Sequence, residues 1–238
     1  MKVLITGGAG YIGSHLVYYF FDRGHEVEVI DNLSTGNKKY LPINIKVHSI
    51  NIGSGEAVTK IILKFCPDII IHLAASVEVE ESVTSPIKYY ENNVVNSLRF
   101  LDSCIQADSK NIVFSSTAAV YGNSSKKLIN ENEDLVPESP YGKSKLIIEN
   151  VLRDLHISNK LNSMIFRYFN VAGADEKKRT GQFKEPASHL IKVACQTALR
   201  ENSKMCIYGN NYDTVDGTCV RDFIHIEDLA EIHLRASK

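Results

Sequence analysis

Residues 2–13 read KVLITGGAGYIG, an apolar run followed at once by a glycine-rich segment. The run predicts a strand, and the helical periodicity after it extends to about residue 23. Gly7, Gly10 and Gly13 permit a tight turn between the two and let backbone amides approach a diphosphate. A strand before this spacing and a helix after it are the context that nucleotide binding requires. We therefore interpret residues 7–13 as a phosphate-binding loop, with a glycine-rich turn that binds nothing as the alternative.

Short apolar runs alternate with helical stretches as far as residue 170. This alternation predicts an α/β fold, a doubly wound parallel sheet of the Rossmann type with helices on both faces. The run at 69–71 is apolar without alternation, as in strands buried on both sides. We expect strands at 2–6, 27–30, 45–48, 69–73, 111–115 and 163–168, and helices at 11–23, 55–65, 87–107 and 141–156.

The second expected strand ends at Asp31, 18 residues after Gly13. A carboxylate at this place accepts hydrogen bonds from the adenosine ribose hydroxyls and repels a 2′-phosphate. The sequence therefore favours NAD over NADP. The alternative is that Asp31 and Asn32 only form a turn.

Tyr141 and Lys145 lie four residues apart in a segment that begins with a helix-capping Ser139 and Pro140. This spacing puts the phenol and the ammonium on one helix face. The ammonium and a nicotinamide cation would lower the pKa of the phenol, which makes Tyr141 a candidate general base for a sugar or alcohol hydroxyl. Thr117 follows the fifth expected strand, where its hydroxyl can bridge the substrate oxygen and the phenol. The alternatives are a surface Tyr–Lys pair and an ordinary loop hydroxyl.

The pattern changes after Asn170. We expect a long loop at 171–186, followed by helices at 188–200 and from 227 onward, and by strands at 205–208 and 220–224. These elements are too few to close a core of their own, and apolar surface should be exposed around 207–226. We predict an NAD-binding domain at 1–170 and an incomplete smaller C-terminal substrate lobe at 171–238.

Composition excludes several classes of protein. A chain of 238 residues can bury a hydrophobic core without disulfides or structural metals. Its net charge of −1 argues against a nucleic-acid partner. No apolar run approaches the roughly 18 residues of a membrane span. Five cysteines without C-x-x-C spacing and eight histidines without H-x-x-x-H spacing indicate neither a disulfide framework nor a metal site. We expect a cytoplasmic protein with reduced thiols that binds no metal, membrane or nucleic acid.

These segments together resemble the extended short-chain dehydrogenase/reductase family, and within it the epimerases of UDP-hexoses. The resemblance runs nearly end to end and is most specific at residues 209–225, GNNYDTVDGTCVRDFIH. It implies an NAD-dependent isomerase that interconverts UDP-glucose and UDP-galactose, a step of galactose metabolism, through a 4-keto intermediate. Family members continue well past residue 238, and they often form homodimers through two helices, which here would be 87–107 and 141–156. Further similarity lies at 3–15, 31–33, 89–94, 140–145 and 167–170.

The resemblance also implies roles for individual residues. Tyr141 would abstract the 4-hydroxyl proton, with Thr117 as the family's catalytic Ser/Thr and Lys145 on the nicotinamide ribose. Asn170 and Arg221 match positions that contact the UDP moiety of the substrate, and Thr117 and Tyr141 match positions that contact its sugar. The implied cofactor contacts are Gly7, Gly10, Tyr11, Ile12, Gly13, Asp31, Asn32, Asn51, Ile52, Leu73, Ala74, Ala75, Asn92, Ser115, Tyr141, Lys145 and Tyr168.

Three alternatives stay open. Nucleotide-sugar dehydratases usually carry an acidic pair where this chain has Ala118 and Ala119, and decarboxylases usually carry Glu at the second position, so both are disfavoured. A uronate epimerase differs mainly in carboxylate contacts. A truncated, inactive NAD-binding remnant is the third. The sequence offers no account of the acidic cluster Glu78, Glu80 and Glu81.

Overall fold

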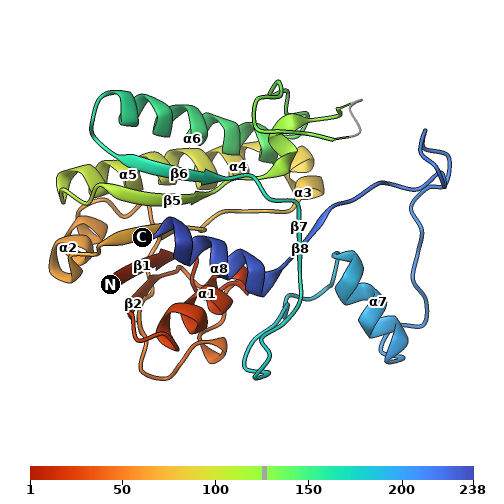
Figure 1. Cartoon of the computed structure of the whole chain (residues 1–238), viewed down its shortest axis with the longest axis horizontal. Helices are drawn as coiled ribbons and strands as arrows, with labels where there is room; N and C mark the ends of the chain where they lie inside the picture. The colour runs from red at the N-terminus through yellow and green to blue at the C-terminus, as the bar shows by residue number, and fades with distance from the viewer. Residues whose placement is uncertain (125–127) are drawn as a thin grey trace.

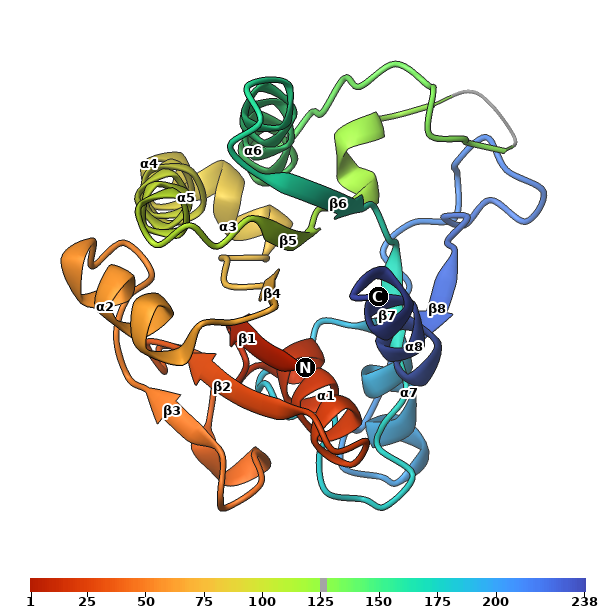
Figure 2. The same cartoon turned by 60° about the vertical axis from the view of Figure 1, so that its left-hand side comes forward.

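A six-stranded parallel sheet forms the centre of the molecule, in the order β3-β2-β1-β4-β5-β6 (Figures 1 and 2). The computed structural model describes residues 1–124 and 128–238. The doubly wound Rossmann fold predicted from the sequence is confirmed. The strands are β1 (Lys2–Thr6), β2 (Glu26–Ile30), β3 (Lys46–His48), β4 (Ile69–His72), β5 (Asn111–Ser115) and β6 (Asn162–Phe166).

The chain starts in the middle of this sheet and winds outward in both directions. β1 pairs with β2 on one side and with β4 on the other. The connections after β1 and β4 therefore leave the sheet toward opposite faces, which opens a crevice at the carboxyl ends of the two strands. This crevice is where an open α/β sheet binds its ligand.

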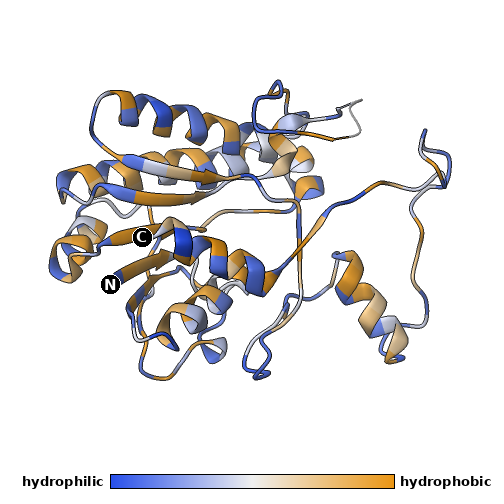
Figure 3. Cartoon of the chain, viewed as in Figure 1, coloured by the Kyte–Doolittle hydropathy of each residue, from blue (hydrophilic) through white to orange (hydrophobic). Residues whose placement is uncertain are grey.

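Alternate side chains of the strands build two hydrophobic cores. Leu4, Ile70 and Phe114 face one side, while Ile5 and Ile71 face the other. The first side is covered by α2 (Glu56–Phe65), α5 (Asn96–Gln106) and α6 (Pro140–Ile157), and the second by α1 (Tyr11–Phe21) and α8 (Ile226–Ala236) (Figure 2). Both faces of the central strands are buried, which explains their unbroken apolar sequence; Figure 3 shows these strands as hydrophobic ribbons.

The helix expected at 87–107 forms with an irregularity inside it. It begins as α4 (Pro86–Tyr89), continues as a π-helical turn over Tyr90–Val95, and ends as α5. A short helix that the sequence did not predict, α3 (Val79–Thr84), precedes it. A π-helical turn carries one extra residue and often lies at a functional site. Two 3₁₀ helices occur at Lys38–Tyr40 and Ala118–Tyr121.

The segment after β6 contains a second, two-stranded sheet. β7 (Asn170–Ala172) pairs in parallel with β8 (Phe223–His225), and α7 (Leu190–Ala198) lies between them in the chain. The strand predicted at 205–208 is wrong: this stretch is irregular, and Ile207 is 75% exposed. A strand needs a neighbour to pair with, and the two-stranded sheet does not extend to this stretch.

The last helix of the chain returns to the main sheet. α8 packs against α1, and its Ala230 is buried among side chains of β1 and β4. In the ranges 1–124 and 128–238, no helix is both long enough and apolar enough to cross a bilayer.

Candidate functional site

The glycine-rich loop lies against the segment that follows β4. Gly7 has a φ of +70°, and a Cβ built on it would be 2.8 Å from the amide nitrogen of Ala74. A Cβ on Gly13 would be only 2.2 Å from the carbonyl oxygen of Gly7. Both positions therefore require glycine, because a side chain would push β1, α1 and the β4 loop apart.

The N-terminus of α1 is free to bind an anion. Its N-cap is Gly10, which offers no side-chain acceptor to the first amides of the helix, and the first turn holds no acidic residue. These amides and the helix dipole attract negative charge at this end. The loop thus fits the diphosphate of a dinucleotide. Tyr11 and Ile12 direct their side chains away from this role: the Tyr11 hydroxyl donates to the carbonyl of Gly173 at 2.7 Å, and Ile12 packs beside the second core.

Asp31 joins two loops of the crevice. Its carboxylate is buried and accepts from the amide of Ala9 at 2.9 Å and from the amide of Leu33 at 2.8 Å. The turn expected of Asp31 and Asn32 is therefore present, and it also links the loop after β2 to the glycine-rich loop. A carboxylate has about four acceptor sites, so two remain for ribose hydroxyls. The ribose contact stays a prediction.

The loop after β4 is held by a cluster of polar side chains that the sequence did not reveal. The Asn93 carboxamide accepts from the amide of Ser76 at 2.8 Å and donates to the Ser76 carbonyl at 2.9 Å and to the hydroxyl of Ser144 at 3.1 Å. Asn92, a predicted cofactor contact, donates to the Ser76 hydroxyl at 3.1 Å. The π-helical turn thus connects the β4 loop, which includes Ala74, to α6.

Tyr141, Lys145 and Thr117 lie together at the carboxyl end of β5, and all three are buried. The Thr117 hydroxyl accepts from the amide of Ala119 at 3.1 Å, and as a neighbour of the Tyr141 phenol it favours the phenolate. The Lys145 ammonium donates to the Ser115 carbonyl at 2.7 Å. The helix that carries the pair starts as predicted, with Ser139 accepting from the amide of Gly142 at 3.1 Å.

Burial changes the acidity of this group. Burial raises the pKa of Tyr141, and the Thr117 hydroxyl opposes the rise. Burial also lowers the pKa of Lys145 to about 7, and the charge of Glu149 opposes this fall. The lowered phenol pKa expected from the sequence is therefore not present in the chain alone, because the ammonium bonds Ser115 and burial outweighs the effect of Thr117. A bound cation would have to supply the remaining attraction for the phenolate.

Two further buried groups surround the pair. Tyr168 bonds the hydroxyl of Ser115, and burial raises the pKa of Tyr168. His72, at the end of β4, lies between the hydroxyls of Thr6 at 2.7 Å and Ser97 at 3.1 Å. Burial lowers the pKa of His72 to about 3, so it is a neutral core histidine.

Two of the predicted substrate residues, Asn170 and Arg221, lie at or near the two-stranded sheet. The Asn170 carboxamide donates to the carbonyl of Asp222 at 3.0 Å. Arg221, the residue before Asp222, is exposed. The structure thus brings Asn170 and Arg221 close in the fold, at one end of the β7–β8 pair.

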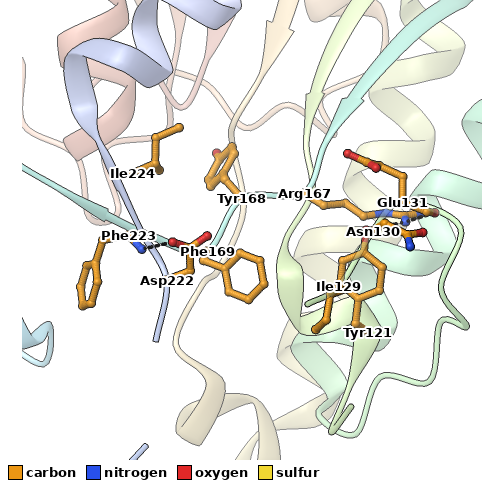
Figure 4. A pocket seen from close by; sticks show the side chains of 10 residues that line it. All are labelled: Tyr121, Ile129, Asn130, Glu131, Arg167, Tyr168, Phe169, Asp222, Phe223 and Ile224. Atoms are coloured by element: carbon orange, nitrogen blue, oxygen red, sulfur yellow. Dashed lines mark hydrogen bonds between the residues drawn. The ribbon is translucent and has the colours of Figure 1, made fainter. Parts of the chain in front are cut away.

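A pocket of about 250 Å³ opens beside this pair of strands (Figure 4). Tyr168, Phe169 and Phe223 line one part of it, and the guanidinium of Arg167 points toward the other part. The remaining lining residues are Tyr121, Ile129, Asn130, Glu131, Asp222 and Ile224.

The other predicted cofactor residues lie in the loops after β3 and β4 and, for Asn32, after β2. The side-chain oxygen of Asn51 accepts from the amide of Gly53 at 2.7 Å. Its NH₂ group can still donate to a base, and its oxygen can accept one more bond. Ile52 is part of the first core. Leu73, Ala74 and Ala75 are partly buried, and Asn32 is exposed.

Residues 173–184 account for the acidic residue Glu78. This segment contacts α1, the loop after β2 and the start of α3. It therefore connects three parts of the chain that are separate in the sequence. The contacts are Gly173 with Tyr11, Thr180 with Ser14 at 2.7 Å, Phe183 stacked on Tyr40 at 4.0 Å between ring centroids, and Lys184 with Glu78.

This arrangement is that of a Rossmann-fold protein with a glycine-rich loop after β1 and a buried tyrosine and lysine on α6. Sequence comparison defines the group further: the chain belongs to the NAD dependent epimerase/dehydratase family, whose model matches residues 3–238. The family resemblance seen in the sequence is thereby confirmed.

Individual relatives and solved structures agree with this assignment. UDP-glucose 4-epimerase of Azospirillum brasilense is 47% identical over 235 residues, which are 99% of this chain and 68% of the relative. The crystal structure of UDP-glucose 4-epimerase from Brucella ovis in complex with NAD matches with a TM-score of 0.94 and 39% identity, over 99% of this chain and 72% of that one. The Bifidobacterium longum UDP-glucose 4-epimerase in complex with NAD⁺ and UDP matches with a TM-score of 0.91 and 33% identity, over 98% and 73%.

Proposed function

We propose that this chain is an NAD-dependent epimerase that interconverts UDP-glucose and UDP-galactose. The observation that carries the proposal is the buried cluster of Thr117, Tyr141 and Lys145 in a chain whose α1 has an uncapped N-terminus after the glycine-rich loop. Its relatives at 40–47% identity are UDP-glucose 4-epimerases, and solved neighbours are described in complex with NAD. The proposal places the protein in galactose metabolism.

The cofactor would be held by the first amides of α1 around its diphosphate and by Asp31 at its adenosine ribose. The nicotinamide supplies the acceptor and donor for one hydride. Lys145 would bind the nicotinamide ribose and keep a positive charge near the phenol. Asp31 opposes a 2′-phosphate, which favours NAD over NADP.

In the reaction itself, Tyr141 would remove the proton of the sugar 4-hydroxyl as hydride leaves the same carbon. Thr117, a neighbour of the phenol, would bridge it to the sugar oxygen. After the 4-keto sugar turns over, the same phenol returns the proton. One base therefore serves both halves of the reaction.

The two residues after Thr117, where a dehydratase usually carries its acidic pair, are Ala118 and Ala119, so these positions hold no acid for an elimination. Ala118 and Ala119 begin the 3₁₀ helix after β5, and the amide of Ala119 donates to the Thr117 hydroxyl at 3.1 Å. Methyl groups there cannot move protons. This favours a reaction that needs only hydride transfer and one base.

We propose that Asn170 and residues 171–238 contact the UDP part of the substrate, while Thr117 and Tyr141 contact its sugar, and that Arg221 binds the diphosphate. A guanidinium can form two parallel bonds to such a group. Arg221 is exposed, which leaves its donors accessible to substrate.

We also propose a cytoplasmic homodimer. Exposed apolar side chains lie on the helices that the family resemblance points to: Ile87 at 75%, Leu98 at 40% and Ile147 at 38% exposure. Covering them with a second copy would remove this surface from water. All five cysteines are free thiols, which suits a reducing compartment.

Incubation of the purified protein with NAD and UDP-galactose, with UDP-glucose as the measured product, tests the proposal. Tyr141→Phe should abolish conversion and leave NAD bound, whereas Tyr19→Phe, the same change on the outer part of α1, should convert normally. Retention of NAD without conversion by the unmodified chain would show an inactive remnant. Conversion of UDP-glucuronate in preference to UDP-galactose would identify a uronate epimerase.

A further inference from the structure

Glu149 is an acidic side chain with no exposed surface, one helical turn after Lys145 on α6. Its carboxylate accepts from the Arg167 guanidinium at 2.7 Å and 3.0 Å and from Arg153 at 2.9 Å. The hydroxyl of Ser116 also donates to it. A buried carboxylate is stable only when partners satisfy it; Arg167 and Ser116 do so inside the protein, whereas the Arg153 side chain is 44% exposed and bonds the carboxylate from outside.

Ser116 is the middle residue of the segment in which Ser115 and Thr117 are predicted to work. Successive side chains of an extended segment point to opposite sides. The Ser116 hydroxyl turns back to Glu149, while Ser115 faces Tyr168 and Thr117 faces Tyr141. The bond that holds Ser116 to α6 therefore restrains the backbone from which Ser115 and Thr117 project.

Arg167 extends the same network to the wall of the pocket. Besides its bonds to Glu149, it donates to the hydroxyl of Tyr121 at 3.0 Å and to the carbonyl of Glu131 at 3.3 Å. Figure 4 shows the Arg167 side chain extending away from Tyr168 toward Asn130 and Glu131. One carboxylate thus organises both the strand end and the loop that follows it.

The charge of Glu149 also acts on Lys145 through the interior of the protein. Lys145 is buried, and this anion favours its protonated form. The other titratable groups that face the pair are His72 from β4, which is neutral, Tyr141 on the same helix and Tyr168 after β6.

We propose that Glu149 is a positioning residue of the epimerase reaction: by holding Ser116 and Arg167 it sets Thr117 against Tyr141 and aligns both with the substrate oxygen. The proposal rests on the epimerase function above. It predicts that losing the single bond to Ser116 slows the chemical step although the ion pair with Arg167 is intact.

Three variants separate positioning from stability. Ser116→Ala removes only the hydroxyl, Glu149→Gln removes the charge, and Arg153→Ala is the matched control, since Arg153 bonds the same carboxylate but does not touch the strand end. Turnover of UDP-galactose gives kcat and KM for each NAD-loaded protein. The titration of the Tyr141 phenol, followed by NMR of ζ-¹³C-labelled tyrosine and assigned with Tyr141→Phe, reports the effect of the Thr117 hydroxyl without any turnover.

We expect Ser116→Ala to lower kcat about tenfold with KM within about twofold of the unmodified protein. The Tyr141 titration should move to higher pH, because the Thr117 hydroxyl favours the phenolate. Glu149→Gln should show both effects more strongly, with the alkaline limb of its kcat profile moved to lower pH, and Arg153→Ala should show neither.

An unchanged kcat and an unchanged Tyr141 titration in Ser116→Ala would overturn the proposal, even if the unfolding temperature falls. Ser116→Ala decides alone if Glu149→Gln does not fold. If the unmodified chain binds NAD but converts no sugar, the proposed function is wrong, and the phenol titration still decides whether Glu149 positions Thr117.

Discussion

Replacing Gly13 with Ala should destabilise the protein, although helix propensity alone predicts the opposite. Gly13 lies in the first turn of α1, where Ala is favoured over Gly by about 1 kcal/mol. The added Cβ would be 2.2 Å from the Gly7 oxygen and 2.6 Å from the Gly8 Cα. Ordinary contact needs ~3.5 Å, so backbone atoms must move by about 1 Å.

Backbone cannot turn aside as a side chain can, so we assign the clash the upper end of the overpacking range, about 3 kcal/mol. The net loss is then about 2 kcal/mol, or a fall in unfolding temperature of about 4–8 °C for a chain of this size. The same movement displaces the amides of the phosphate loop. We expect the Kd for NAD to rise by ~10-fold or more, equivalent to ~1.4 kcal/mol.

Thermal unfolding and calorimetric titration with NAD measure the two effects. Gly181→Ala is the matched control, because its new Cβ would meet only Ala174, at an ordinary 3.5 Å. An unfolding temperature of Gly13→Ala equal to or above that of the unmodified chain, with unchanged NAD affinity, would refute the reasoning.

Three further predictions follow from buried polar groups. Asp31→Asn places an amide against the amides of Ala9 and Leu33; we expect a loss of about 1–3 kcal/mol of stability in urea unfolding and weaker NAD binding, and equal stability would contradict it. Burial lowers the pKa of His233 from 6.5 to about 4, so the unfolded chain takes up a proton at a higher pH than the folded chain does. The free energy of unfolding should therefore fall by about 3 kcal/mol as pH falls from 6.5 to 4. In His233→Gln, unfolding measured across this range should depend less on pH. Cys104 is buried and its pKa is raised by burial, whereas the other four cysteines are exposed, so thiol labelling of the native protein should show four fast groups and one slow one.

Much of the fold could be predicted because each strand is a local signal. The run at 69–71 is apolar at every position, as is typical of a strand covered on both faces. α3 was missed because VEESVT is short and mostly polar. The false strand at 205–208 shows the converse: local β-propensity forms a strand only where a neighbour offers hydrogen bonds.

The site was predictable to the extent that its residues repeat at fixed spacing. The four-residue interval between Tyr141 and Lys145 predicts that they share a helix face, and the spacing of the glycines predicts the phosphate-binding loop. Asn93 carries no such spacing, and a polar residue on a helix is interpreted as solvent-exposed until the strand it meets is known. In retrospect, Glu149 continues the four-residue interval from Lys145, which is the one signal the sequence held.

Because of the π-helical turn at Tyr90–Val95, the contacts on either side of the turn depend on the exact number of residues within it. Each residue of an α-helix turns the next by about 100°, so a single extra residue rephases everything beyond it. Upstream of the turn, Tyr89 is buried; within it, Asn93 reaches Ser76 and Ser144; downstream, Phe100 and Cys104 enter the first core. Deleting one residue here would give a more regular helix, but the side chains before and after the turn could no longer both face the core. We therefore expect homologous chains that keep the bonds from Asn93 to Ser76 and Ser144 to keep the extra residue of the π-helical turn as well, even where neighbouring residues differ.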